Sequence, residues 1–419
     1  MTPLMALLAA VAYVVVGRWL VGLRTRWRDA AFALLNLAAL YFFFFFDQNP
    51  ESTLRGNVIF AAYLTLVSAQ YVALVCWSER SGRLPWLAFL MPIAILATVR
   101  YAPLHELATI FHGSGRDVFQ RQLGSDLNGE FIGLSYLAFR TSYLVLEIRN
   151  GVVPRPSLCE YLGFAFFTPT LSVGPISPYS QYRHAFAETG RPEIPIGRAL
   201  LRVLVGAVKF RFFGPLLNQF TYSGLLLDGH PHHWVDLPIS ALAYYLYLYC
   251  NFSGFCDIAI GSSGLMGISV AENFNSPFAA RNVKDFWNRW HITLSHYMRD
   301  VVFSPLSKTL VRAFGPAQAN QAIALAILVV FLLIGMWHGT AKRYAAFGAV
   351  HGIGVVANHY FTIMLKKRLG KESFAAYNRN RMIQAAAVVL TFLYVTASLF
   401  LFANNAANMQ QIFSMLRWY

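Results

Sequence analysis

Two histidines lie where an imidazole could move a proton. His291 belongs to the polar run NRWHITLSHYMRD at 288–300, and His338 ends an apolar run that begins at Ala322. An imidazole titrates near neutral pH, so either ring could take a proton from a hydroxyl group. A positioned base of this kind accelerates a reaction by about 100- to 10,000-fold. The two residues therefore predict acid–base chemistry on a hydroxyl.

The segment around His291 has the pattern of an amphipathic helix. Apolar residues recur at steps of three and four from Val283 to Val302, and Pro305 then limits the pattern. The polar stripe of this helix consists of Lys284, Asn288, His291, Ser295 and Arg299. Such a helix suits the membrane interface or the wall of a polar cavity, and an ordinary interfacial helix with a water-facing side is an equally open explanation.

His338 lies at or just inside the boundary of its apolar run. The sequence FLLIGMWHGT places Trp337, His338 and Gly339 at the end of that run. An ionisable group at membrane depth is costly and usually lines a cavity or a pathway. The alternative is a histidine at a helix end whose ring bonds a backbone carbonyl. Because His291 is a second such residue, we favour a shared polar site.

Composition identifies the elements that must position these histidines. The chain of 419 residues is 57% hydrophobic and 13% charged, with a mean hydropathy of +0.47, which excludes a soluble surface. Clear apolar runs cover 4–21, 30–46, 58–77, 84–99, 131–146, 239–252, 322–337, 344–365 and 383–402, with weaker ones at 161–173 and 199–217. A bilayer core about 30 Å thick needs roughly 20 apolar residues per helix. We therefore expect an all-α integral membrane protein, a single membrane domain over 1–419 with roughly nine to eleven transmembrane or re-entrant helices and with interfacial amphipathic helices.

The distribution of basic residues predicts the orientation of the chain. Basic loops follow the first, third and fifth spans and precede the last; they contain Arg24, Arg26, Arg28, Arg80, Arg83, Arg149, Arg155, Lys366, Lys367, Arg368 and Lys371. The positive-inside rule places these loops in the cytoplasm and both termini outside, with the first span retained. The loops account for most of the formal net charge of +15, and the remainder could attract an acidic partner. No separate basic module stands out, so we exclude nucleic acid as a partner.

Other clusters of reactive residues are weaker. The four cysteines form no Cys-x-x-Cys pair and are interpreted as packing residues. The run HPHH at 230–233 has only Asp228 and Asp236 nearby, so we predict no metal site there. Arg140 and Glu147 share one helical face and could pair or line a cavity, with an architectural role favoured.

The motifs around the two histidines carry a family resemblance. FWNRWHITLSHYMRDVVFSPL, followed by GMWHGT with its histidine 47 positions after His291, resembles the signature of the membrane-bound O-acyltransferase family. The upstream segments NFSGFCDIAIGSSGLMGISVAENFNSPF, GLSYLAFRTSYLVLEIRNG and TPTLSVGPISPYSQY are similar to the bacterial branch that modifies polymers by D-alanylation or O-acetylation. The resemblance covers about 133–352, whereas the loop 229–234 and the C-terminal segment have no match.

This resemblance implies a catalytic site inside a ring of helices around a central tunnel. Family members move an acyl group from a cytoplasmic thioester to a hydroxyl, and the polymer-modifying members present it to acceptors outside. The invariant family histidine corresponds to His338, the candidate general base, and the second characteristic polar position corresponds to His291. The oxyanion formed during transfer needs hydrogen-bond donors in a low-dielectric site. Candidates for binding substrate or that oxyanion, besides His291, are Asn288, Trp290, Ser295, Arg299 and Trp337.

Charge and resemblance together suggest the donor and the acceptor. An acidic phosphopantetheinyl acyl carrier protein or the phosphates of an acyl-coenzyme A could bind Arg281, Lys284 and Arg289, and we expect no tightly bound cofactor. The acyl group would be small, D-alanyl or acetyl. The acceptor would be a glycopolymer or another envelope hydroxyl outside a bacterial cytoplasmic (inner) membrane, with a partner acyltransferase as an option. A transporter and a nonenzymatic scaffold of an envelope-modifying complex stay open as alternatives.

Overall fold

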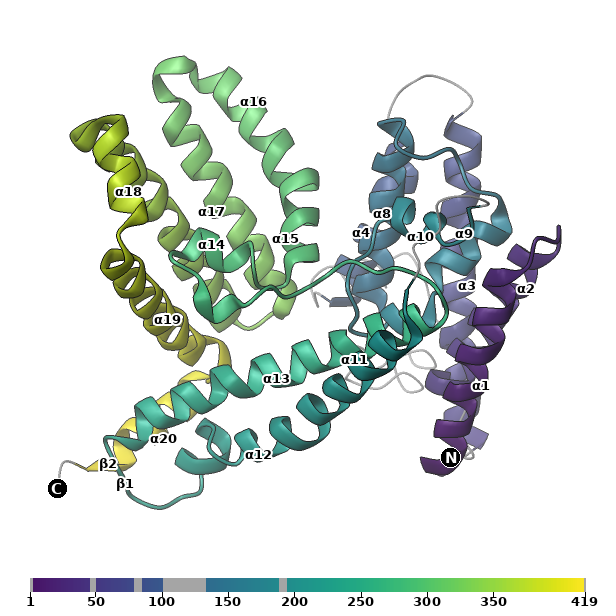
Figure 1. Ribbon diagram of the computed structural model, residues 1–419, viewed down its shortest axis with the longest axis horizontal. Coiled ribbons are helices and arrows are strands. Elements are labelled where there is room, and N and C mark those ends of the chain that lie inside the picture. Colours follow the sequence, from purple (N-terminus) through teal and green to yellow (C-terminus); the bar gives the residue numbers. More distant parts are fainter. Residues whose placement is uncertain (1–2, 46–49, 79–84, 101–132, 188–193, 418–419) are drawn as a thin grey trace, which may run out of the picture. The chain divides into compact units, whose positions relative to one another are not determined.

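Helices dominate the computed structural model, which describes residues 3–45, 50–78, 85–100, 133–187 and 194–417 (Figure 1). Five helical stretches among these residues are long and apolar enough to cross a membrane: Leu4–Gly22, Arg28–Phe45, Gly56–Cys76, Pro316–His338 and Arg381–Ala403. Two short strands, β1 (His232–His233) and β2 (Leu416–Arg417), pair in parallel. The prediction of an all-α membrane protein is confirmed. Arg80 and Arg83, two of the basic residues used to predict the orientation, lie outside the described residues.

The chain divides into two compact units. Unit 1 comprises Met1–Gly206 and Phe255–Ala271, and unit 2 comprises Ala207–Gly254 and Glu272–Tyr419. The long helix α13 (Asp236–Leu265) therefore contributes its first part to unit 2 and its last part to unit 1. The single membrane domain over 1–419 stays a prediction. Both histidines singled out from the sequence belong to unit 2.

Unit 1 is a bundle whose helices bury a polar network. Its described helices are α1 (Pro3–Gly22), α2 (Arg28–Leu40), α3 (Pro50–Ser78), α4 (Trp86–Arg100), α8 (Leu134–Arg149), α9 (Leu158–Ala165), α10 (Tyr179–His184) and most of α11 (Ile196–Val208). The buried amide of Asn36 accepts hydrogen bonds from the Tyr13 hydroxyl at 2.7 Å and from the Thr168 backbone N–H at 3.1 Å. These bonds tie α1 and α2 to the segment after α9, because a polar group buried in a membrane bundle is costly unless it is hydrogen-bonded.

Arg140 and Glu147 of α8 each bind backbone groups of neighbouring segments. Arg140, which is 2% exposed, donates to the carbonyl oxygens of Phe164 at 3.1 Å and Thr170 at 2.8 Å. Glu147 accepts from the backbone N–H groups of Tyr179 at 2.7 Å and Ser180 at 3.2 Å, at the start of α10. These contacts agree with the architectural role predicted for the two residues, because they hold α9 and both ends of the segment that connects α9 to α10.

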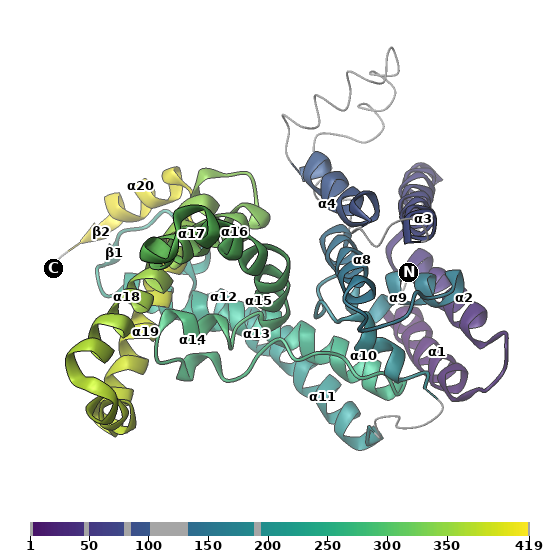
Figure 2. The same ribbon diagram turned by 90° about the horizontal axis from the view of Figure 1, so that it is seen from above.

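Unit 2 contains α12 (Gly214–Asn218), α14 (Val283–Trp287), α15 (Ile292–Met298), α16 (Ser304–Phe314), α17 (Ala319–His338), α18 (Lys342–Arg379), α19 (Arg381–Ala403) and α20 (Ala406–Met415). Helices α16, α17 and α18 run beside one another (Figures 1 and 2). Gly335 of α17 and Gly348 of α18 permit this packing, because a Cβ on either glycine would collide with the backbone of the facing helix. The close approach brings the end of α17, with His338, against the first turns of α18.

The helix predicted continuously from Val283 to Val302 is interrupted, and that prediction was wrong. Helix α14 ends at Trp287, and α15 begins only at Ile292. Between them, Trp290 forms an antiparallel bridge with Phe274, and the N–H of Ile292 donates to the Asn273 carbonyl at 3.0 Å. This pairing replaces the helical hydrogen bonds and holds His291 in the left-handed conformation, with φ 45° and ψ 51°. Pro305 also lies in the first turn of α16 rather than ending a helix, which suits a residue without a backbone N–H.

Candidate active site

A pocket of about 60 Å³ inside unit 2 is lined by His291 and His338 together. A third histidine, His351 of α18, lines the same pocket. The remaining walls are aromatic and aliphatic side chains, among them Phe252, Trp290, Phe402 and Leu399. Three imidazoles in a small apolar cavity can exchange protons with a substrate while little water is present.

The protonation of His291 follows from its partner Asn273. The backbone N–H and the hydroxyl of Thr293 donate to Oδ1 of Asn273 at 3.2 Å and 2.8 Å, which fixes this oxygen as an acceptor. The same Oδ1 lies 3.2 Å from Nδ1 of His291, so Nδ1 must carry the proton of that bond. Nε2 of His291 is buried and has no hydrogen-bond partner among the residues that the structure describes. In the neutral ring this nitrogen keeps its lone pair and can act only as an acceptor.

Burial also keeps the His291 ring neutral. The side chain is 2% exposed, and this desolvation lowers the pKa of the imidazole below its ordinary value, with nearby His338 lowering it further. The Phe252 ring packs against His291 with centroids 4.8 Å apart. A neutral imidazole of this kind can accept a hydrogen bond from a substrate at physiological pH.

His338 is held by rings from three helices. It is the last residue of α17, and its ring centroid lies 4.9 Å from that of Phe402 on α19 and 6.2 Å from that of Phe347 on α18. The Trp337 ring lies 4.6 Å from His338 and 5.8 Å from His291 by centroids, so it touches both predicted histidines. The end of this apolar run thus lines the same pocket as His291, although most of the lining is apolar.

His351 was missed in the sequence, although a signal for it was present. It is an ionisable residue inside the apolar run 344–365, and such residues commonly line a functional cavity. It is fully buried, with its Nδ1 3.1 Å from Nε1 of Trp287 and its Nε2 2.8 Å from Oγ of Ser398. Both ring nitrogens of His351 are therefore hydrogen-bonded, whereas in His291 only Nδ1 has a partner within the described segments.

A second and larger cavity of unit 2, about 1130 Å³, is lined by basic and amide side chains. It contains all three predicted donor-attracting residues, Arg281, Lys284 and Arg289. Asp285 accepts a hydrogen bond from the Arg289 side chain at 2.9 Å, which fixes one of these cations and offsets part of its charge. The lining also includes amides and aromatic rings from α18 and α19, a surface suited to an anionic, partly apolar group.

The other candidate site residues lie in different parts of unit 2. Trp290 lines the histidine pocket, whereas Asn288 lines the basic cavity. The buried hydroxyl of Ser295 has no hydrogen-bond partner in the described part of the chain, and the half-exposed Arg299 pairs with Asp300 at 2.8 Å. Residues that share one stripe in the sequence thus face two cavities and a surface, because the left-handed turn at His291 changes the direction of the chain.

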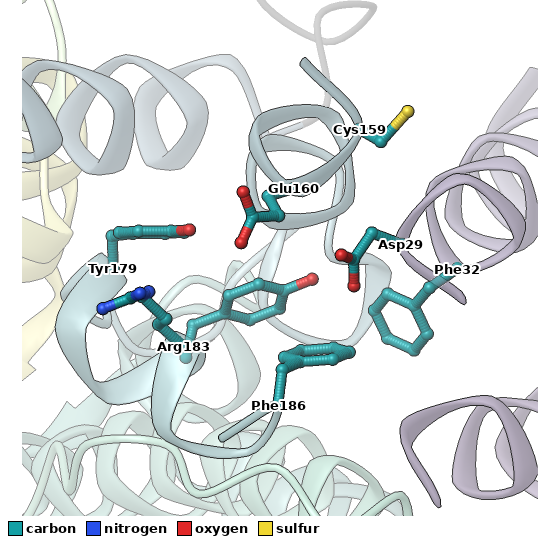
Figure 3. Close-up of a pocket in the computed structure, with 8 residues that line it drawn as sticks. Asp29, Phe32, Cys159, Glu160, Tyr179, Arg183 and Phe186 are labelled. Carbon is teal, nitrogen blue, oxygen red and sulfur yellow. The ribbon is translucent and has the colours of Figure 1, made fainter. Parts of the chain in front are cut away.

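Unit 1 holds a much smaller polar cavity between α2, α9 and α10. Figure 3 shows the carboxylates of Asp29 and Glu160 pointing toward it, with Arg183 nearby. Its volume of about 10 Å³ is that of a single water site. Glu160 also closes a capping box with Ser157 at the start of α9. This cavity is too small for an acyl donor or an acceptor.

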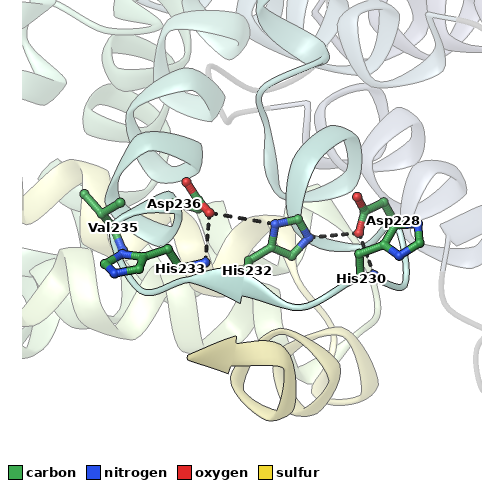
Figure 4. Close-up of polar contacts among 6 residues, drawn as sticks. All are labelled: Asp228, His230, His232, His233, Val235 and Asp236. Atoms are coloured by element: carbon green, nitrogen blue, oxygen red, sulfur yellow. Dashed lines mark hydrogen bonds and ion pairs between the residues drawn. The ribbon is translucent and has the colours of Figure 1, made fainter. Parts of the chain in front are cut away.

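The histidine-rich loop is organised by two aspartates. Nε2 of His232 lies 2.8 Å from Oδ1 of Asp228, and its Nδ1 lies 3.8 Å from Oδ2 of Asp236 (Figure 4). Asp236 also accepts from the His233 backbone N–H at 3.0 Å. Within the described part of the chain, no group of three or more His, Cys, Asp or Glu is placed to hold a metal ion. The contacts explain the loop as a support for the β1–β2 pair.

Comparison with known proteins adds independent information. The family model of the membrane-bound O-acyltransferases matches residues 84–403. A protein of Streptococcus thermophilus named teichoic acid D-alanyltransferase is 29% identical over 82% of this chain and 88% of its own length. The protein of the same name from Bacillus subtilis is 30% identical over 66% of this chain and 69% of its own length. A probable alginate O-acetylase of Pseudomonas aeruginosa is 27% identical over 68% of this chain and 50% of its own length.

Proposed function

The chain belongs to the membrane-bound O-acyltransferase family, and from this premise we propose that it transfers a small acyl group from a cytoplasmic thioester to a hydroxyl of an extracytoplasmic polymer. The observation that supports this proposal best is the pocket that His291 and His338 line together, where Nε2 of His291 is buried and has no hydrogen-bond partner among the described residues. Family membership also favours an enzyme over the transporter and the nonenzymatic scaffold that the sequence left open.

The proposed reaction is a direct acyl transfer. The acceptor hydroxyl loses its proton to His338 while its oxygen attacks the thioester carbonyl carbon. The tetrahedral intermediate then collapses, the carbon–sulfur bond breaks, and the thiolate leaves and takes up the proton that His338 holds. The products are an ester on the acceptor and a free thiol on the donor carrier. Holding both substrates in one dry pocket supplies the proximity that such a step requires.

The basic cavity is the proposed entry of the donor. A phosphopantetheinyl acyl carrier protein and an acyl-coenzyme A both carry phosphate, and Arg281, Lys284 and Arg289 would attract either one. Their thiol arm is long and flexible, so a carrier docked in the basic cavity could extend its acyl end toward the histidines. This donor is a co-substrate rather than a bound cofactor.

We propose D-alanyl as the acyl group because two of the relatives carry that activity in their names. Acetyl is the second candidate, and the lining of the pocket favours it: none of the described lining residues is a carboxylate that could pair with the ammonium of D-alanine. The aromatic rings there could compensate through cation–π contacts, worth about 2 kcal/mol when desolvated. The two groups therefore need a direct comparison.

The comparison uses the purified protein in proteoliposomes, with radiolabelled D-alanyl and acetyl thioesters on both an acyl carrier protein and coenzyme A. Teichoic acid and alginate oligomers serve as acceptors, and label in the polymer is measured after removal of the donor. The proposal expects transfer from at least one thioester, with D-alanyl on a carrier protein the most active. Absence of transfer from every donor by a folded protein would overturn it.

The site of action is proposed to be a bacterial cytoplasmic membrane with both termini outside. The basic loops, including the one around Lys371, would then be cytoplasmic. Reporters fused after Arg28 or Lys371 should be active in the cytoplasm, and a reporter fused after Tyr419, which lies outside the described residues, should be active outside. The reverse pattern of signals would contradict the orientation. A partner acyltransferase on the outer side is compatible with this arrangement.

Removing cationic charge from the basic cavity should weaken donor binding. Arg281→Gln and Lys284→Gln are each expected to raise the donor KM about threefold and to reduce its dependence on salt, because exposed charges contribute about 0.2–1 kcal/mol each and are screened. Steady-state kinetics at low and high ionic strength measure both effects. Lys308→Gln, on the exposed side of α16 and outside the cavity, is the matched control. If all three variants have the same KM, Arg281 and Lys284 do not help to bind the donor and serve only to orient the chain in the membrane.

A further inference from the structure

A one-directional chain of hydrogen bonds passes through His351. The indole N–H of Trp287 can only donate, so Nδ1 of His351, 3.1 Å away, must accept. The neutral ring then carries its proton on Nε2, which lies 2.8 Å from Oγ of Ser398. Ser398 in turn donates to the Val395 carbonyl at 2.7 Å. The chain connects α14, α18 and α19 and selects one neutral tautomer of His351.

This chain lies at the boundary between the two cavities of unit 2. On α14, Trp287 lines the histidine pocket, whereas Lys284 and Asn288 on its other side line the basic cavity. On α18, His351 lines the pocket and Gly354, three residues later, lines the basic cavity. Helix α14, held through Trp287, is therefore a wall that both cavities share.

The two cavities differ in what they would hold. The basic cavity is about 1130 Å³ and has room for many waters, whereas the histidine pocket is about 60 Å³ and mostly apolar. A thioester in the pocket would be hydrolysed if water from the larger space reached it, because a base that activates a hydroxyl also activates water. The wall between them must therefore admit the acyl arm and exclude water.

We propose that His351 is a positioning residue that latches Trp287 in this wall, so that acyl transfer is favoured over hydrolysis of the donor. The inference rests on the proposed function. The reaction that the latch suppresses is attack of water on the thioester carbon, which breaks the carbon–sulfur bond and yields a free carboxylic acid and the thiol carrier. His351 acts through Trp287 and does not itself take the acceptor proton.

The test measures two products of the same donor: acyl groups on the polymer and free acid. His351→Leu removes the acceptor for the indole N–H, and Trp287→Phe removes the donor while a ring remains in the wall. Each variant is expected to lower transfer by about tenfold and to raise the ratio of hydrolysis to transfer by about tenfold, with little change in the donor KM. His351→Asn, whose amide oxygen lies near the position of Nδ1, should restore much of the wild-type ratio.

His359→Leu is the matched control. It removes another histidine of α18, which bonds Asn320 at 3.2 Å and lines neither cavity, and it should leave the product ratio unchanged. If the wild type transfers and Trp287→Phe keeps its product ratio while folded, the latch is refuted and the proposed function stands. If the wild type transfers nothing, both ideas fail. Poor folding of His351→Leu alone leaves Trp287→Phe to decide.

Discussion

His338→Ala is expected to lower kcat by at least about a hundredfold while donor binding stays nearly intact, because the variant lacks the base that takes the acceptor proton. The residue ends α17 and is packed between rings of α18 and α19, so alanine also removes packing there. Loss of kcat with an unchanged donor affinity is the signature of a group that acts mainly in the transition state.

The measurement requires the variant in detergent with monodisperse elution and an unchanged thermal unfolding midpoint. Transfer to a hydroxyl acceptor and binding of a non-transferable donor analogue are then measured side by side. Phe402→Leu, which alters the packing around the ring and leaves the imidazole in place, is the control for a structural effect. Full activity of a folded His338→Ala protein would remove the general base from the mechanism.

The fold class and the two histidines could be predicted from the sequence because each depends on local information. Apolar runs of membrane length predict spanning helices whatever their neighbours are. His338 was identifiable since an imidazole at the end of such a run is costly without a function. Arg281, Lys284 and Arg289 were identified by charge and clustering, and the structure brings them into one cavity.

Features that depend on contacts between residues far apart in the chain could not be predicted from the sequence. The break before His291 arises from backbone bonds to the segment around Asn273 and Phe274, which no local periodicity records. Asn288 and His291 look like members of one helical stripe, yet they face different cavities. His351 is defined by Trp287 and Ser398, which lie 64 and 47 residues away in the chain. Such partners become visible only when the helices are packed.

The structure narrows the role of His291. As a neutral ring it already uses its N–H toward Asn273, so its Nε2 is an acceptor and cannot donate to an oxyanion. An acceptor at that position can orient the donor or hold the acceptor hydroxyl before His338 removes its proton. We therefore propose that donors such as the indole of Trp290, which lines the same pocket, stabilise the oxyanion.

His291→Ala is accordingly expected to reduce kcat/KM by about a hundredfold, a loss of roughly 3 kcal/mol in transition-state stabilisation. Alanine keeps a Cβ in the left-handed conformation, so the backbone cost of that turn is similar in both proteins. Kinetics of the purified variant, together with its thermal unfolding, distinguish a loss of catalysis from a loss of folded protein. A kcat/KM within about threefold of the wild type would contradict any direct part for His291 in transfer.

A second pair of variants tests which nitrogen of His291 acts. Asn273→Asp keeps an acceptor for Nδ1–H and should preserve the tautomer, whereas Asn273→Leu removes it and frees the ring to protonate Nε2 instead. If Nε2 must accept, Asn273→Leu should lose at least about tenfold in kcat while Asn273→Asp retains most activity, since a wrong tautomer alone can disable a catalytic histidine. If Nε2 instead donates to the oxyanion, Asn273→Leu should be the more active of the two. The order of these two rates therefore decides whether Nε2 of His291 accepts or donates a hydrogen bond during transfer.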